Sequence, residues 1–187
     1  MKFSKKHLIV TTVLVSFCAV LIATLGKGLN LNPNSTGNAL LNKDAKPFSV
    51  RLVQTSKMHK QLDDRNFVTL EDFKGKPIIL NFWASWCVSC RAEAHELESF
   101  ARKYADKDVQ VIGIAIHDTE ESAEEFISRY GKSYTIAMDL DGKAGINYGV
   151  TGVPETFFIG ADGLIKHKEA GPVTVSIMEN KLPLILK

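Results

Sequence analysis

The sequence predicts an α/β domain tied to a membrane by an N-terminal helix, and two observations lead to this class. From residue 48 onward, short apolar segments alternate with amphipathic ones, which is typical of a mixed, mostly parallel sheet with helices on its faces and an antiparallel edge. Before them, the uncharged apolar run 8–25 follows a lysine-rich start. A chain of 187 residues, 45% hydrophobic and 24% charged, is sufficient for one compact domain and this extra segment.

The apolar run 8–25 is long enough for a membrane anchor, because as a helix it spans about 27 Å, close to the thickness of the hydrocarbon core. A cleaved signal peptide is the alternative. Its apolar region is usually shorter and ends at a small-x-small site, for which residues 24–26 are the best match here. We therefore expect an uncleaved, single-pass signal-anchor, in which Cys18 is a small apolar residue. The basic flank 1–7 stays in the cytoplasm, so the remainder is expected on the periplasmic side.

Residues 26–46 are expected to form a flexible tether that leads to the domain 47–187. The tether is rich in Gly, Asn, Ser and Lys and has no sustained periodicity. Residues 1–27 hold four of the 23 basic residues and none of the 21 acidic ones, so the exported part has 19 basic residues against 21 acidic ones, a net charge of −2. The basicity of the whole chain is therefore a topology signal, and we expect no nucleic-acid partner.

The first half of the domain is expected to contain two buried strands on either side of a helix. Residues 48–53 and the start of 67–77 have the composition of short strands. Segment 77–84 is nearly continuously apolar, as is 109–116, and such runs are typical of strands buried on both faces. Between them, residues 88–105 predict a helix, because apolar side chains recur on one face at helical spacing: Ala94, Leu97, Phe100, Ala101 and Tyr104.

The second half is expected to open with a helix at 118–131, which has Asp118 as its N-cap, Glu121 three residues later and Gly131 as its stop. The segments after it alternate in the same way. They are a strand at 134–139, a short helix within 142–150, two strands around a Gly-Ala-Asp-Gly turn within 155–171, and a last helix at 175–186 that Pro183 interrupts or ends.

Two cysteines, Cys87 and Cys90, lie where the strand 77–84 ends and the helix 88–105 begins. This position exposes the first sulfur at the carboxyl edge of the sheet, near unpaired N–H groups of the helix start, which favours thiolate. Cys90 lies one turn inside the helix, close enough to resolve a mixed disulfide formed at Cys87. Because the thiolate is the reactive form, and an unperturbed thiol is only about 3% ionised at pH 7, the position predicts thiol–disulfide exchange.

Other roles for the two cysteines have less support. A disulfide that closes so short a segment stabilises a fold little. A zinc site needs a second pair of ligands, and the histidines show no matching spacing. Copper(I) accepts two thiolates, so a copper delivery module stays open as an alternative. A peroxidatic cysteine is disfavoured, because the preceding residues, Leu-Asn-Phe-Trp-Ala-Ser, lack the expected proline and threonine.

Two further residues are candidates for the site. Glu93 follows Cys90 by three residues, so it lies one turn further along the helix and can accept a proton from Cys90; the alternative is a surface glutamate. Pro154 begins an apolar strand, a position where proline is tolerated in any case. Beside a reactive thiol, it can also leave the backbone of Val153 free to pair with a substrate peptide.

These motifs carry a resemblance to a known family. Phe-Lys-Gly-Lys-Pro-Ile-Ile-Leu-Asn-Phe-Trp-Ala-Ser-Trp-Cys-Val-Ser-Cys-Arg-Ala-Glu, with the later Gly-Val-Pro-Glu-Thr, resembles the membrane-anchored TlpA-like proteins, most closely their DsbE/CcmG branch. The resemblance covers roughly residues 47–180. It implies a thioredoxin-like fold with an inserted helix and strand, which 118–139 can supply, and a buried Asn81 where ordinary thioredoxins have Asp. The pair Val88-Ser89 departs from the family, which commonly has a proline there.

The resemblance also implies roles for the site residues. Cys87 is the nucleophile, Cys90 the resolving cysteine and Glu93 the active-site acid. Val153–Pro154 is a cis peptide that faces the cysteines, and the substrate is expected to contact Trp86, Val153, Pro154 and Glu155.

The function that the resemblance implies is reduction of apocytochrome c, or of proteins that handle it, during cytochrome c maturation. A membrane electron carrier of the DsbD/CcdA type re-reduces the cysteine pair, and no cofactor or metal is expected. We expect a monomer in the cytoplasmic membrane with its catalytic domain on the periplasmic side. A general disulfide oxidant or isomerase of exported proteins, and the copper(I) module, are the alternatives.

Overall fold

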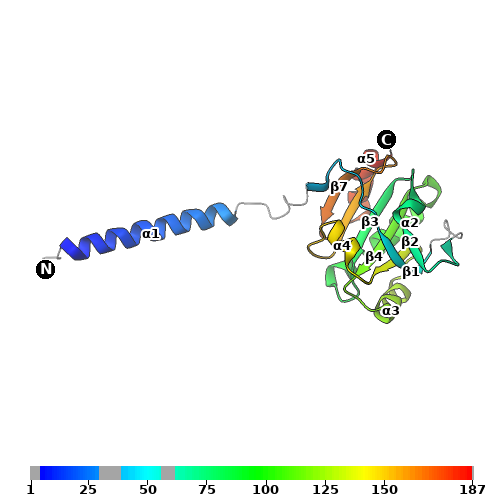
Figure 1. Ribbon diagram of the computed structural model, residues 1–187, viewed down its shortest axis with the longest axis horizontal. Coiled ribbons are helices and arrows are strands. Elements are labelled where there is room, and N and C mark those ends of the chain that lie inside the picture. Colours follow the sequence, from blue (N-terminus) through cyan, green and yellow to red (C-terminus); the bar gives the residue numbers. More distant parts are fainter. Residues whose placement is uncertain (1–4, 30–38, 56–61, 187) are drawn as a thin grey trace. The chain divides into compact units, whose positions relative to one another are not determined.

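The computed structural model describes residues 5–29, 39–55 and 62–186 (Figure 1). The chain divides into two units, of which the first holds helix α1 (Lys5–Leu29) and the second begins at residue 37. Within α1, the stretch Ile9–Gly26 has a mean hydropathy of 2.4 and is long and apolar enough to cross a membrane. The predicted anchor 8–25 lies inside this helix.

The second unit is an α/β domain built on one sheet with strand order β2-β1-β5-β4-β3-β6-β7. The central strands β3, β4 and β5 are parallel, and the outer pairs are antiparallel. The mixed sheet predicted from the sequence is therefore confirmed. The strands span β1 (Ser49–Gln54), β2 (Phe67–Thr69), β3 (Ile78–Trp83), β4 (Gln110–Ile116), β5 (Thr135–Asp139), β6 (Glu155–Ile159) and β7 (Ile165–Ala170).

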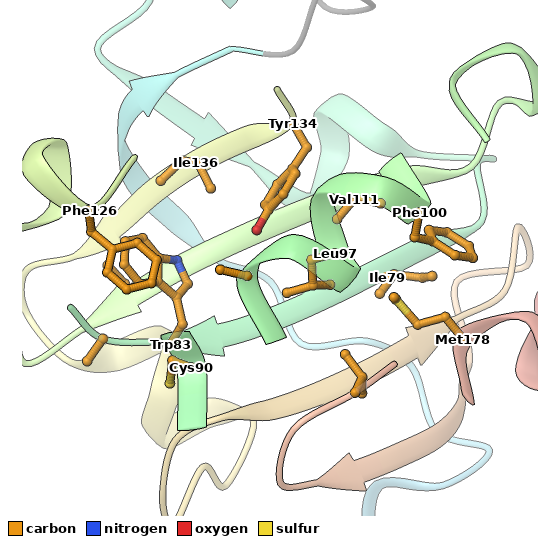
Figure 2. Close-up of a cluster of buried hydrophobic side chains, with 14 of the residues drawn as sticks. Ile79, Trp83, Cys90, Leu97, Phe100, Val111, Phe126, Tyr134, Ile136 and Met178 are labelled. Carbon is orange, nitrogen blue, oxygen red and sulfur yellow. The ribbon is translucent and has the colours of Figure 1, made fainter. Parts of the chain in front are cut away.

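Helices cover both faces of this sheet, so β3, β4 and β5 are buried on both sides. On one face, α2 (Val88–Lys103), α3 (Glu120–Tyr130) and α5 (Val175–Ile185) pack against a cluster that includes Ile79 and Trp83 (Figure 2). On the other face, α4 (Lys143–Asn147) and the 3₁₀ turn η3 (Leu70–Phe73) cover a cluster that includes Leu80 and Phe82. A second 3₁₀ turn, η4 (Ala105–Lys107), follows α2.

Two helix ends differ from the expectation. Helix α3 is capped by Thr119, whose Oγ1 accepts from the backbone N–H of Ser122 at 3.2 Å, and not by Asp118, which is engaged elsewhere. Helix α5 runs through Pro183 and is not broken there. Pro183 lies in the last turn, where its missing N–H removes a single hydrogen bond, and Leu186 N still donates to Leu182 O at 3.1 Å.

The segment predicted as a tether, 26–46, has regular structure at both of its ends. Its first residues, 26–29, belong to α1, and 30–38 lie outside the described residues. Residues 42–45 pair with the start of β7: Asn42 N donates to Ile165 O at 2.8 Å and Ala45 N to Gly163 O at 2.9 Å. Strand β6 is antiparallel to β3, so the end of β6 and the start of β7 lie beside the start of β3. This attachment therefore lies at the opposite pole of the sheet from the segment that follows β3.

Candidate active site

The two predicted cysteines form a disulfide at the junction of β3 and α2, with their Cα atoms 5.3 Å apart. Cys87 is the N-cap of α2, with extended backbone angles, and its Sγ accepts from the backbone N–H of Cys90 at 3.0 Å. A helix N-terminus offers such unpaired N–H groups to an anion, so the same contact stabilises a thiolate at Cys87 after reduction. Cys87 is 5% exposed and Cys90 2%, which makes Cys87 the sulfur that an incoming disulfide reaches first.

The loop before Cys87 is hydrogen-bonded to the residues that directly follow β4. Asp118 accepts from the backbone N–H of Ser85 at 2.6 Å and from its hydroxyl at 2.8 Å. The indole N–H of Trp86 donates to the carbonyl oxygen of His117 at 3.0 Å, while the ring itself is 58% exposed. Trp86 is therefore fixed in place beside the disulfide with a free apolar surface. Sequence reasoning assigned Asp118 to a helix cap and missed this contact.

The Val153–Pro154 peptide is cis, as the resemblance implied, and it faces the disulfide. The carbonyl oxygen of Val153 lies 3.5 Å from Cys87 Sγ. Pro154 immediately precedes β6, which pairs with β3, so the sheet itself brings this loop to the cysteines. Substrate binding by Val153 and Pro154 stays a prediction.

Glu93 is buried behind the disulfide, 2% exposed, so the surface alternative is wrong. One carboxylate oxygen accepts from the side-chain amide of Asn81 at 2.9 Å, and the other accepts from the backbone N–H of Val173 at 2.8 Å. Asn81 in turn donates to the hydroxyl of Thr156 at 3.0 Å. Burial raises the pKa of Glu93 to about 7, although both hydrogen bonds and the charge of Lys132 act in the opposite direction. An acid with this pKa can take up and release protons near neutral pH.

Lys132 is a buried lysine that no pattern in the sequence singles out. It is 6% exposed, and its Nζ donates to the hydroxyl of Tyr134 at 2.5 Å. The ammonium lies over three aromatic rings, at 4.6 Å from the centroid of Trp83, 4.9 Å from Tyr134 and 5.2 Å from Phe126. Burial lowers its pKa to about 7, against the attraction of Glu93 and of Glu98.

Glu155 is positioned by its neighbours and is 4% exposed. One oxygen accepts from the hydroxyl of Thr151 at 3.0 Å, and the other forms an ion pair with Lys168 at 2.7 Å. These contacts brace the loop that holds Pro154. The expected contact between Glu155 and a substrate stays a prediction.

Within the described residues, no group of three or more His, Cys, Asp or Glu side chains is placed to hold a metal ion. A copper(I) ion would need only the reduced thiolates of Cys87 and Cys90, so this alternative needs its own test.

A C-x-x-C disulfide at a strand–helix junction, facing a cis-proline, defines a thiol–disulfide oxidoreductase of the thioredoxin fold. The model of the redoxin family matches residues 42–182, well over half of the chain, and the chain belongs to this family.

Curated relatives and solved structures agree with this class. The chain is 37% identical to the thiol:disulfide interchange protein DsbE of Allochromatium vinosum, over 89% of this chain and 86% of the relative. It is 34% identical to the protein of the same name from Yersinia pestis, over 93% and 90%. The crystal structure of a thiol:disulfide interchange protein of the thioredoxin family from Chlorobium tepidum matches with a TM-score of 0.65 and 25% identity, over 77% of this chain and 96% of that one. The resemblance to the DsbE branch is therefore confirmed.

Proposed function

We propose that the chain is an extracytoplasmic reductant that acts on disulfides of apocytochrome c, or of the proteins that handle it, during cytochrome c maturation. The observation that carries the proposal is the buried carboxyl of Glu93 behind a C-x-x-C pair, in a chain whose relatives are DsbE proteins. An acid that titrates near neutral pH suits a step in which the resolving cysteine must lose its proton.

The chemistry starts from the reduced pair. The Cys87 thiolate attacks one sulfur of the client disulfide, forms a mixed disulfide and releases the other client sulfur as a thiolate. Cys90 then transfers its proton to Glu93 and attacks Cys87 Sγ. The Cys87–Cys90 bond forms, the bond to the client breaks, and the client has gained two electrons that the pair has lost. We expect Val153, whose carbonyl oxygen lies 3.5 Å from Cys87 Sγ, to pair with the client backbone during the first attack.

The N-terminal helix supports a location in the cytoplasmic membrane, with the domain on the periplasmic side, by its length and its basic flank. In that oxidising compartment the pair needs a dedicated electron supply. We propose a membrane carrier of the DsbD/CcdA type as this donor, and a monomer as the working form.

Replacement of each cysteine tests the proposal. We expect Cys87→Ser to abolish reduction of an apocytochrome C-x-x-C-H peptide disulfide, because the remaining thiol of the pair, Cys90, is buried. Cys90→Ser should accumulate a mixed disulfide with the same peptide, visible as a mass shift that dithiothreitol removes. Cys18→Ser is the matched control and should retain full activity. Full reduction by Cys87→Ser would overturn the mechanism.

A general oxidant is the second candidate, favoured by the departure of Val88-Ser89 from the proline-containing pair common in the family. Acid quenching of intact cells, followed by an alkylating mass tag, separates the two directions. A mostly reduced pair supports the reductant, whereas a mostly oxidised pair together with normal cytochrome c levels in a deletion strain supports the oxidant. Copper(I) retained stoichiometrically by reduced protein, and lost in Cys87→Ser, would favour the delivery module.

A further inference from the structure

Lys132 lies in the core, where a charged side chain is energetically costly. It follows Gly131, which ends α3 in the left-handed conformation at φ 65°, and the turn directs the chain back into β5. Its backbone oxygen is fixed by the side-chain amide of Gln54 at 2.7 Å. Within the described residues, no carboxylate forms an ion pair with its Nζ. A buried ammonium without a carboxylate in contact is costly, so its retention calls for compensation.

The surroundings of this ammonium join it to the redox site. Trp83 is the last residue of β3, the strand that leads into the cysteines, and its ring is the nearest of the three. Figure 2 shows Trp83, Phe126, Tyr134 and Cys90 in one buried cluster. Aromatic faces and a phenol oxygen stabilise a cation without neutralising it. Its positive charge therefore remains available to act on carboxylates further away in a poorly screened interior.

Two elements, α2 and β5, contribute the charged and titratable side chains that interact with Lys132. Helix α2 contributes Glu93 and Glu98, and β5 contributes Tyr134. Glu98 is bound by Arg102 and by the backbone N–H of Ser133, the latter at 2.6 Å, so it has partners of its own. Within the described residues, Glu93 has only uncharged hydrogen-bond partners, which are Asn81 and Val173.

Among the described residues, no other charged group acts on Glu93 or Lys132. Strand β3 and helix α3 present rings, and β6 reaches Glu93 through Thr156 and Asn81. Of the two carboxylates that Lys132 attracts, Glu93 is therefore the one without a cation at hydrogen-bonding distance.

We propose that Lys132 is a positioning residue for the redox reaction: its ammonium keeps Glu93 in the carboxylate form that accepts the proton of Cys90. The inference rests on the proposed function of Glu93. When Lys132 is charged, the ionised carboxylate is favoured, Cys90 can be deprotonated, and the mixed disulfide at Cys87 is resolved. When the lysine charge is removed, Glu93 holds its proton to a higher pH and resolution slows at neutral pH.

The direct test is the titration of the Glu93 carboxyl in the full chain in detergent, with no client present, followed by infrared difference spectroscopy and assigned with Glu93→Gln. Lys132→Met removes the charge and keeps most of the volume. We expect the midpoint to rise by about one pH unit from about 7, since a neighbouring charge shifts a pKa by one unit or more. Lys74→Met, in an exposed surface pair, is the control and should leave the midpoint unchanged.

Kinetics provide the second readout. At pH 7, an upward shift of one unit leaves roughly a tenth of Glu93 ionised instead of half, so Lys132→Met should resolve a Cys87–peptide mixed disulfide about fivefold more slowly. The rising limb of the pH profile should move upward by the same unit, while alkylation of Cys87 is unaffected. In a Glu93→Gln background, Lys132→Met should cause no further change in the pH profile, because the two residues act through one step.

Should Lys132→Met fail to fold, Tyr134→Phe tests the same idea. It removes the hydroxyl that accepts from Lys132, favours the neutral amine and should raise the Glu93 midpoint by a smaller amount. A Glu93 midpoint that is the same in both variants and in the unmodified chain overturns the proposal, as does an additive effect of Lys132→Met on the Glu93→Gln profile. Failure of the proposed function would show instead in the cysteine variants and leave this titration unchanged.

Discussion

At the residue scale, the main feature of the site is that Glu93 has hydrogen bonds to both oxygens and still has a raised pKa. Two hydrogen bonds normally favour a carboxylate, so desolvation must outweigh them. The fold thus retains an acid whose charged form is costly at neutral pH. Such a compromise between stability and reactivity is common where a group must give and take protons.

The stability of a Glu93→Gln variant should depend on pH. A carboxyl whose folded pKa is raised binds more protons in the folded state, so its contribution to stability is present below pH 4.5 and is lost as the pH rises to about 7. Glutamine has no such loss. We expect Glu93→Gln to gain about 3 kcal/mol in free energy of unfolding between pH 4.5 and pH 8 relative to the parent, because the shift of roughly 2.5 units, which already includes the attraction to Lys132, corresponds to about 3 kcal/mol.

Denaturant titrations of the oxidised full chain, followed by tryptophan fluorescence at the two pH values, measure this difference. Glu96→Gln, on the same helix, is a control. A difference that is constant with pH would contradict the raised pKa.

At the element scale, β4 approaches its neighbours so closely at Gly113 that a side chain there would crowd them. A Cβ there would lie 2.9 Å from Ile136 Cδ1, 3.0 Å from Trp83 Nε1 and 3.2 Å from Tyr134 Cε2. The absence of a side chain therefore makes room for two of the rings that surround Lys132. The packing of β3, β4 and β5 and the surroundings of the buried lysine depend on each other.

Gly113→Ala should destabilise the domain by about 1–3 kcal/mol, because the added methyl forces these side chains out of place. Gly145→Ala is the matched control. There, the nearest atom to an added Cβ is Asp139 Oδ2 at 3.5 Å, an ordinary contact, and alanine suits the helix α4. Urea unfolding of both variants should show a lower midpoint for Gly113→Ala alone; equal midpoints would mean that β4 can relax.

Local patterns predicted some elements of the site and not others. Cys87, Cys90 and Pro154 lie in short motifs whose spacing already fixes their positions relative to a strand and a helix. Asp118 and Lys132 lie in turns, and their contacts depend on how α3 and β5 pack against the rest of the sheet. Nothing in a linear pattern reports that packing. The position of Glu93 beside Cys90 could be predicted from helical spacing. Its burial could not, because it depends on the loop whose Val173 N–H binds the carboxylate.

At the scale of the whole molecule, the chain enters the domain at the pole opposite the disulfide. The proposed donor within the membrane and the proposed client in the periplasm would require the site to face different directions at different times. We expect the tether predicted at 26–46 to allow this reorientation.

Deletion of residues 31–37 should therefore impair re-reduction of the Cys87–Cys90 disulfide by the donor more than it impairs reduction of a client. We expect the deleted chain to accumulate several-fold more of the oxidised pair in cells, measured by acid quenching and alkylation, while its reduction of insulin in solution is unchanged. A replacement of the same length with Gly and Ser should restore the redox state. Equal oxidation in all three chains would show that the domain reaches its donor without this freedom.

The two edges of the sheet have a further consequence for copies that share one membrane. Copies held by the proposed anchor would meet one another often, and an open strand edge is a template for pairing with a neighbour. Here β2 has only three residues, and residues 42–45 cover the start of β7. The rest of β7 has the sequence Lys-His-Lys-Glu-Ala, whose charged side chains oppose the approach of a second identical edge. We expect these features to oppose edge-to-edge association at the surface density that the proposed anchor would impose.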